Sequence, residues 1–161
     1  MNKKDLVTYL NDHHAGATGA LEMLNALAKS FQGQPLELFF KNLQTEIQAD
    51  FEALESLMKK IGSEGSAIKQ AGAWVAEKIS RAKLGASDPA ADQLELFQAL
   101  ETLMLGITGK CALWAALAAA AEGEPALRLL DYAKLQERAV QQRDRVEAER
   151  LRVARELFSQ G

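Results

Sequence analysis

Residues 9–22 read Tyr9-Leu10-Asn11-Asp12-His13-His14-Ala15-Gly16-Ala17-Thr18-Gly19-Ala20-Leu21-Glu22, and they form the middle of a longer patterned segment, 2–31. Apolar residues recur along that segment every three to seven positions, at Leu6, Leu10, Ala17, Leu21, Leu24 and Leu27. This spacing places them on one face of an α-helix. The stretch also holds both histidines of the protein and two glycines three positions apart. We therefore expect one long helix here, and any polar site to involve it.

Prolines and glycines mark where the other helices begin and end. Pro35, Pro89 and Pro125 each precede a helical pattern, and proline at the first helical position loses no hydrogen bond. Glycines stand where the patterns stop, at Gly33, Gly62, Gly85 and Gly123. Asp88 is expected to be the N-cap of the helix that begins at Pro89. The predicted helices are 2–31, 35–61, 66–84, 89–122 and 125–159, and no segment alternates as a strand does.

Each of the other long segments has its own apolar stripe. The segment 35–61 has Leu36, Phe40, Leu43, Ile47, Phe51, Leu54, Met58 and Ile61. The segment 89–122 has Leu96, Leu100, Leu103, Ile107, Trp114 and Leu117. The last segment has Leu129, Ala133, Val140, Leu151, Ala154 and Phe158. These patterns predict an all-α protein in which residues 1–161 form a single helical domain.

The lengths of the connections predict the topology. The first two long helices, and likewise the last two, are joined by only a few residues, which makes each pair an antiparallel hairpin. Between the pairs, the segment 66–84 is long enough to carry the chain from one end of a bundle back to the other. We therefore expect a ferritin-like four-helix bundle with a long helical crossover, since a simple up-down-up-down bundle needs no such segment.

Three short segments resemble an uncharacterised bacterial family that has a ferritin-like bundle. They are Tyr9-Leu10-Asn11-Asp12-His13, Trp74-Val75-Ala76-Glu77-Lys78 and Gly109-Lys110-Cys111-Ala112-Leu113-Trp114. The resemblance covers most of the chain. It implies the fold and no established activity.

Composition limits the classes of partner. The net charge of −3 gives no general attraction to nucleic acid, so we expect no nucleic-acid partner. Cys111 is the single cysteine, which excludes an intramolecular disulfide and favours a cytoplasmic location. The longest apolar run, 111–121, is shorter than the roughly 20 residues of a membrane-spanning helix, so we expect no membrane partner.

Four glutamates are candidates for a metal site. Counted from one end of the predicted bundle, Glu22, Glu46, Glu101 and Glu147 each lie about ten residues down a different long helix, and so within roughly one turn of one level. Ferritin-like di-iron proteins hold their metals with such a ring, and two of the helices also supply a Glu-x-x-His pair. Here the residues three positions after Glu46 and Glu147 are Ala49 and Arg150. Iron or manganese held by carboxylates alone is one hypothesis, and salt bridges to nearby arginines are the other.

A second polar site is predicted lower on the bundle. His13 lies on the apolar stripe of 2–31 and is expected to face inward, whereas His14 lies at the edge of that stripe. Glu55 and Glu137 fall at about the same level on other helices. His13, together with Asp12, Glu55 or Glu137, is a candidate for a mononuclear metal site, with a hydrogen-bonded core histidine as the alternative.

Two pairs of glycines lie at matching heights on the first helix and on the helix 89–122. They are Gly16 with Gly19, and Gly106 with Gly109. A glycine inside a helix costs about 1 kcal/mol relative to alanine, which indicates a packing or binding reason. Close approach of the two helices is one interpretation, and space for a flat ligand between them is the other.

Three classes of function follow from these patterns. The first is a non-catalytic protein that acts through self-association, as a dimer, or through another partner, with Trp74 and Val75 as candidate contacts. The second is a ferritin-like metal protein or oxidoreductase that uses the four glutamates. The third is a small-ligand binder at the glycine-lined seam, which a pocket beside Gly16 and Gly106 would favour. We expect no resident cofactor, with iron or manganese as the alternative.

Overall fold

The structure is a computed structural model that describes residues 1–63 and 88–159, and all the regular secondary structure in these ranges is helical. Four long helices are present, together with a short 3-10 helix, η1 (Pro125–Leu127). The long helices are α1 (Lys3–Ser30), α2 (Pro35–Ile61), α4 (Gln93–Gly123) and α5 (Tyr132–Phe158). The prediction of an all-α fold is confirmed for the described residues. The predicted helix 66–84, with Trp74 and Val75, lies outside them.

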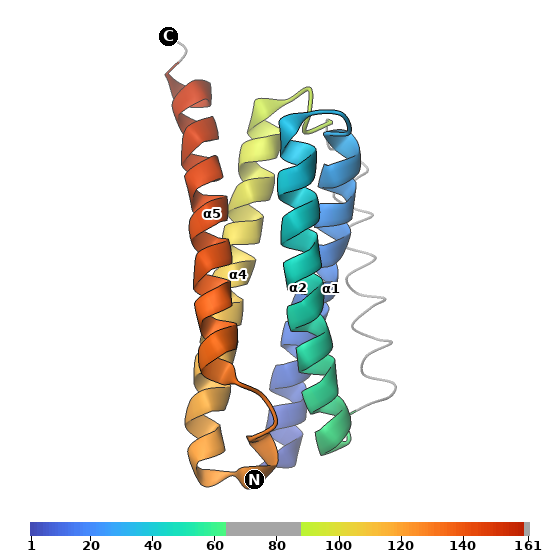
Figure 1. The fold of residues 1–161 in the computed structure, drawn as a ribbon, viewed down its shortest axis with the longest axis vertical. Helices are drawn as coiled ribbons and strands as arrows, with labels where there is room; N and C mark the ends of the chain where they lie inside the picture. Colours follow the sequence, from blue (N-terminus) through green and yellow to red (C-terminus); the bar gives the residue numbers. More distant parts are fainter. Residues whose placement is uncertain (64–87, 160–161) are drawn as a thin grey trace.

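The four long helices lie side by side along the long axis of the molecule (Figure 1). α1 and α2 pack together as one antiparallel hairpin, and α4 and α5 pack together as another. α2 ends at one end of the bundle, whereas α4 begins at the opposite end, so these two helices run in the same direction. The molecule is thus a helical bundle made of two hairpins.

Local sequence explains how the first hairpin turns. α1 ends before a turn in which Gly33 has a φ of +79°, a left-handed conformation that glycine adopts without steric cost. The backbone N–H of Gly33 donates to Glu37 Oε2 at 2.9 Å, and Pro35 begins α2. α2 ends at Gly62, whose φ of +72° is again left-handed. These two stops were predicted correctly.

The predicted starts of the last two helices were wrong by several residues. α4 begins at Gln93, because the Asp92 side chain accepts from the backbone N–H groups of Leu94 and Glu95 and caps the helix there. Asp88 instead accepts from the backbone of Ala90 inside the preceding turn. In the same way, Asp131 caps α5. Pro89 therefore begins a turn and Pro125 begins η1, and in both cases an aspartate further along the chain begins the long helix.

The core forms where the apolar stripes meet, and three of the four predicted stripes are largely confirmed. All six predicted stripe residues of α4 are buried, as are six of the eight in α2 and three of the six in α1. The stripe predicted for the last helix was wrong, since Leu129, Leu151 and Phe158 are exposed. The buried residues of α5 are instead Tyr132, Leu135, Ala139, Gln142, Val146 and Val153. These follow a spacing of three and four residues from the true helix start, and one of them is polar.

α4 has apolar residues on its outward side as well as in the core. Leu105 is 61% exposed, and Leu94 is also exposed. By length and composition alone, α4 would be able to cross a membrane, a test that the core helix of a soluble protein also passes. α4 therefore has more apolar surface than its packing in the bundle buries.

Candidate functional site

Two of the four predicted metal-binding glutamates lie against one arginine. Arg150 Nε and Nη2 donate to both carboxylate oxygens of Glu147, at 2.7 and 2.8 Å, and its Nη1 donates to Glu101 Oε2 at 2.9 Å. The bidentate hydrogen bond from Arg150 lowers the pKa of Glu147. Arg150 stands three residues after Glu147, where a Glu-x-x-His motif would have its histidine. Its guanidinium thus occupies the space between the two carboxylates.

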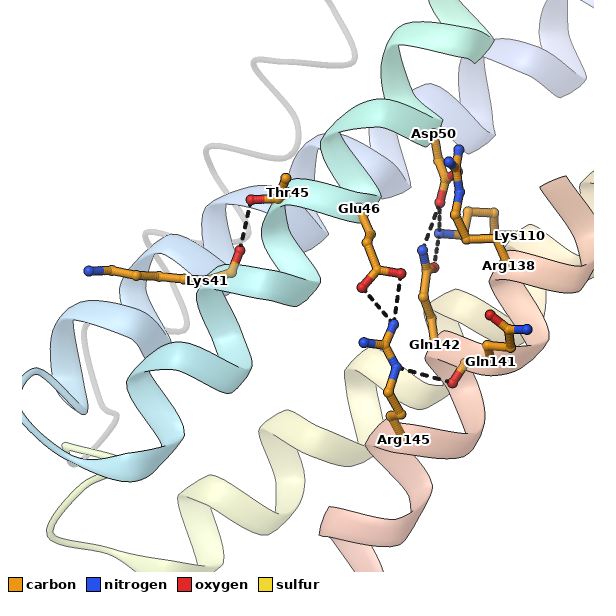
Figure 2. Close-up of polar contacts among 9 residues, drawn as sticks. All are labelled: Lys41, Thr45, Glu46, Asp50, Lys110, Arg138, Gln141, Gln142 and Arg145. Carbon is orange, nitrogen blue, oxygen red and sulfur yellow. Dashed lines mark hydrogen bonds and ion pairs between the residues drawn. The ribbon is translucent and has the colours of Figure 1, made fainter. Parts of the chain in front are cut away.

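Among the described residues, the other two predicted glutamates make no hydrogen bond or ion pair with Glu101, Glu147 or Arg150. Glu46 pairs with Arg145, whose Nη2 lies 2.8 and 2.7 Å from its two carboxylate oxygens (Figure 2). Glu22 lies on an exposed position of α1. In the described ranges, no group of three or more His, Cys, Asp or Glu side chains is placed to hold a metal ion. A metal at this level would have to displace arginine side chains, and iron or manganese binding stays a prediction.

The second predicted polar site is arranged differently from the prediction. His14, rather than His13, is the buried histidine, at 4% exposure. Its Nε2 lies 3.3 Å from Glu55 Oε2, and its ring packs against Phe51 with 4.6 Å between centroids. His14 follows the buried Leu10 by four residues, which places both on one helix face. The expectation that His14 lies at the edge was wrong, whereas His13 is half-buried and lines a cavity between the helices.

His13 lies at the border of a cavity, and Glu137 is exposed on α5. The His13 ring is half-buried and meets Tyr9 edge-on, with 4.7 Å between centroids. Burial lowers the pKa of His13, and the nearby Asp12 partly opposes this shift. The structure therefore brings Glu55 to His14 and places His13 and Glu137 apart from that pair.

A buried polar cluster, which we define as Asp50, Lys110, Arg138 and Gln142, joins α2, α4 and α5 (Figure 2). Asp50 is only 2% exposed. Its carboxylate accepts hydrogen bonds from Lys110 Nζ at 2.6 Å, from Arg138 Nε at 2.8 Å and from Gln142 Nε2 at 3.1 Å. Lys110 Nζ also donates to Gln142 Oε1. Every charged member therefore has a polar partner, which a charge away from water requires.

The charges of the polar cluster do not cancel. Asp50 contributes one negative charge, whereas Lys110 and Arg138 would contribute two positive charges. Burial lowers the pKa of Lys110, and this effect exceeds the opposing effect of Asp50. Because an arginine does not lose its proton, Lys110 is the member whose charge can change.

The polar cluster was missed in the sequence, although a signal for it exists. Asp50, Lys110 and Gln142 each stand three residues after one buried apolar residue and four before another. Those flanking residues are Ile47 and Leu54, Ile107 and Trp114, and Ala139 and Val146. A polar residue at such a position faces the core. Three of them on three helices indicate a shared buried network.

A cavity of about 260 Å³ lies between α1, α2 and α4, beside the polar cluster. Most of its described lining residues are apolar or glycine, and they include Ile47, Phe51, Leu54, Leu113 and Trp114. Four polar residues also line it: Asp12, His13, Asp50 and Lys110. An apolar concavity with a few polar groups is the usual form of a small-molecule site.

Three of the predicted seam glycines line this cavity: Gly16, Gly106 and Gly109. A Cβ atom added at any of them would meet no described atom within 4 Å, apart from its own helix backbone and chain neighbours. The interpretation that these glycines allow close helix packing was therefore wrong, since they border open space. Gly19 is not among the described lining residues.

Trp114 lines the cavity and has an unpaired donor. Its side chain is 1% exposed, and its Nε1–H has no hydrogen-bond partner among the described residues. A buried donor without a partner costs about 1–3 kcal/mol. A residue that lines the cavity thus carries a buried donor without a partner among the described residues.

No family model, no curated protein and no solved structure matches this chain. The resemblance drawn from residues 9–13, 74–78 and 109–114 stays a prediction.

Proposed function

We propose that this protein binds a small, largely apolar molecule in the cavity between α1, α2 and α4. The observation that carries the proposal is a hollow of about 260 Å³ at a seam where three helical glycines meet no neighbour among the described residues. Glycine inside a helix destabilises it by about 1 kcal/mol relative to alanine, so three of them bordering empty space have no packing benefit to offset that cost. Room for a bound ligand, which larger side chains at these positions would fill, explains why glycine is present there.

The size and walls of the cavity describe the molecule that would fit. The volume falls just below the roughly 300–1,000 Å³ of sites for drug-sized ligands, so the occupant would be smaller than those. Its body would contact side chains such as Phe51 and Leu113, and burying that apolar surface would supply most of the free energy of binding.

Cavity-filling variants test this proposal. Binding of four probes, 1-hexanol, benzyl alcohol, hexanoate and benzoate, is measured by ligand-observed NMR and calorimetry. We expect at least one probe to bind, and Gly106→Leu to abolish that binding by placing a side chain in the cavity. Gly123→Leu is the matched control, because Gly123 is on the same helix, its added Cβ also meets no described atom within 4 Å, and it does not line the cavity.

Two results would overturn the proposal. One is the absence of binding by all four probes at millimolar concentration. The other is a Gly106→Leu variant that binds a probe as tightly as the unmodified protein does.

We propose self-association through α4 as a second candidate function. Leu94, Leu105, Ala112, Ala116 and Ala119 are all exposed and share one face of α4 at helical spacing. A second copy of the chain would bury this face. Sedimentation analysis tests the candidate: Leu105→Asp should convert a dimer to a monomer, whereas Leu38→Asp, an equally exposed position on α2, should not. A monomer at all concentrations in the unmodified protein would exclude it.

We also propose that the bundle is ferritin-like in topology. The shared direction of α2 and α4 in Figure 1 supports this assignment, because a ferritin-like fold contains one such long connection. The metal hypothesis is tested by elemental mass spectrometry of protein purified without chelators. Near-stoichiometric iron or manganese that disappears in a Glu46→Ala, Glu147→Ala double variant would support it, and metal-free protein would contradict it.

A further inference from the structure

We infer that the ligand of this cavity carries a carboxylate group, which Lys110 and Trp114 bind together. The inference rests on the proposed function, because it specifies the chemistry of the molecule that the cavity takes. Three separate observations support it: the charge of the polar cluster, the hydrogen-bond donors that face no partner, and the placement of both donors on one side of α4.

The charge of the polar cluster favours an anion. With Lys110 protonated, the cluster has two positive charges and one negative charge. The Lys110 and Asp50 side chains are largely buried, at 14% and 1% exposure, whereas Arg138 is partly exposed, at 32%. A buried charge without a counterion is costly, and one ligand carboxylate would bring the total to zero.

The other ionisable groups at the cavity do not oppose this assignment strongly. Asp12 is exposed on α1, where water and salt screen its charge. Burial lowers the pKa of His13 below its ordinary value of 6.5, which favours the uncharged ring. Asp50 is already neutralised by Arg138.

The hydrogen-bond donors favour an acceptor that contains oxygen. A lysine ammonium has three N–H donors, and two of those of Lys110 are directed to Asp50 and Gln142. The third donor has no partner among the described residues. The Nε1–H of Trp114 is a second such donor. The two oxygens of a carboxylate would accept from both.

The positions of Lys110 and Trp114 make joint binding feasible. They are four residues apart on α4 and both line the cavity, so they lie one turn apart on the same helix face. The remaining walls are apolar. The ligand class is therefore a small monocarboxylate with an aliphatic or aromatic body, for which hexanoate and benzoate are suitable probes.

Matched pairs of probes test the inference by calorimetry. Hexanoate is compared with 1-hexanol, and benzoate with benzyl alcohol, since each pair shares its apolar body and differs in the head group. We expect the carboxylate to bind at least about tenfold more tightly than the alcohol, as a charge-assisted hydrogen bond predicts. Lys110→Met should remove that preference, because the variant retains the apolar wall and loses the ammonium.

Arg145→Met is the control for the loss of a cation, because Arg145 is an exposed partner of Glu46 and does not line the cavity. It should bind both members of each pair as the unmodified protein does. Lys110→Met should fold, since Asp50 keeps Arg138 and Gln142 as partners.

A measurement on the unmodified protein does not depend on that variant. The Trp114 indole N–H signal, assigned in 15N NMR spectra with Trp114→Phe, should move downfield on addition of benzoate and stay in place on addition of benzyl alcohol. An unmoved signal at saturating benzoate would overturn the inference.

The failure of the inference differs from the failure of the proposed function. If acids and alcohols bind equally, and Lys110→Met changes neither affinity, the cavity binds small molecules and the carboxylate assignment is wrong. If no probe of either kind binds, both proposals are overturned.

Discussion

Asp50 and Glu46 lie one turn apart on α2, and each pairs with an arginine of α5, yet the two ion pairs differ in their exposure to water. The Asp50 side chain is buried and accepts from three residues, whereas Glu46 and Arg145 are both partly exposed. A pair that water reaches contributes little, because solvent already stabilises both charges. A buried carboxylate whose removal leaves cations without a partner matters far more.

The first prediction compares these two carboxylates. Asp50→Asn should lower the free energy of unfolding by about 3–5 kcal/mol, since Lys110 and Arg138 lose their only buried counterion among the described residues. Glu46→Gln should lower it by no more than about 1 kcal/mol. Urea denaturation followed by circular dichroism measures both. Equal effects of the two substitutions would contradict the burial of the cluster.

The second prediction concerns pH and His13. Because burial lowers the pKa of His13 in the folded protein, the unfolded chain binds the proton more readily between that lowered value and 6.5. Stability contributed by the neutral ring is therefore present above pH 6.5 and is lost as the pH falls through the lowered pKa. As the pH falls through this range, the free energy of unfolding of the unmodified protein should fall more than that of the His13→Gln variant, which has no imidazole to protonate. A constant difference between the two from pH 7.5 to 5 would show that His13 is not desolvated.

At the scale of the element, aspartates rather than prolines begin α4 and α5. An N-cap side chain accepts hydrogen bonds from backbone N–H groups that the helix leaves without partners. A proline in the first turn is compatible with the helix but supplies no such hydrogen bond. Asp92 accepts from two such N–H groups, at 2.9 and 3.3 Å. Pro89 lies in the turn before α4, and Pro125 lies in η1, before α5.

The third prediction tests this assignment. Asp92→Ala should lower the free energy of unfolding by about 0.5–2 kcal/mol, because the cap is lost. Asp92→Asn should lower it much less, since asparagine caps about as well as aspartate. Thermal and urea denaturation measure both variants. An alanine variant as stable as the unmodified protein would place the start of α4 elsewhere.

At the scale of the whole molecule, the face of α4 on which a residue lies determines whether that residue is buried in the core or exposed to solvent. Leu103 is 2% exposed and packs in the core, whereas Leu105, two residues further on, lies on the outer face. Leu21, predicted to be a core residue, is only partly buried. The same residue type at neighbouring positions therefore has opposite roles.

The fourth prediction uses this pair. Leu103→Asp should unfold the protein, because a carboxylate placed in the core has no partner there. Leu105→Asp should change the free energy of unfolding of the monomer by no more than about 0.5 kcal/mol, as surface substitutions usually do. Far-UV circular dichroism and thermal melting distinguish them. A native spectrum for Leu103→Asp would contradict the packing of α4.

The sequence alone was sufficient to predict the helical class, the first hairpin and the core stripe of α4. These features follow from local spacing and from residues such as Gly33, Pro35 and Gly62, whose conformational preferences do not depend on distant contacts. The position of three glycines on one seam was also predictable, because helical rise converts residue number into height.

The tertiary structure alone decided what those residues meet. Which histidine is buried depends on a rotation of about 100° between adjacent positions of a helix, which a partly apolar stripe does not specify. The pairing of Glu101 and Glu147 with Arg150, and of Asp50 with Lys110, requires three helices to be placed side by side. Whether a helical glycine permits close packing or borders a cavity depends on the atoms across the seam. That difference is a property of packing, and no single helix encodes it.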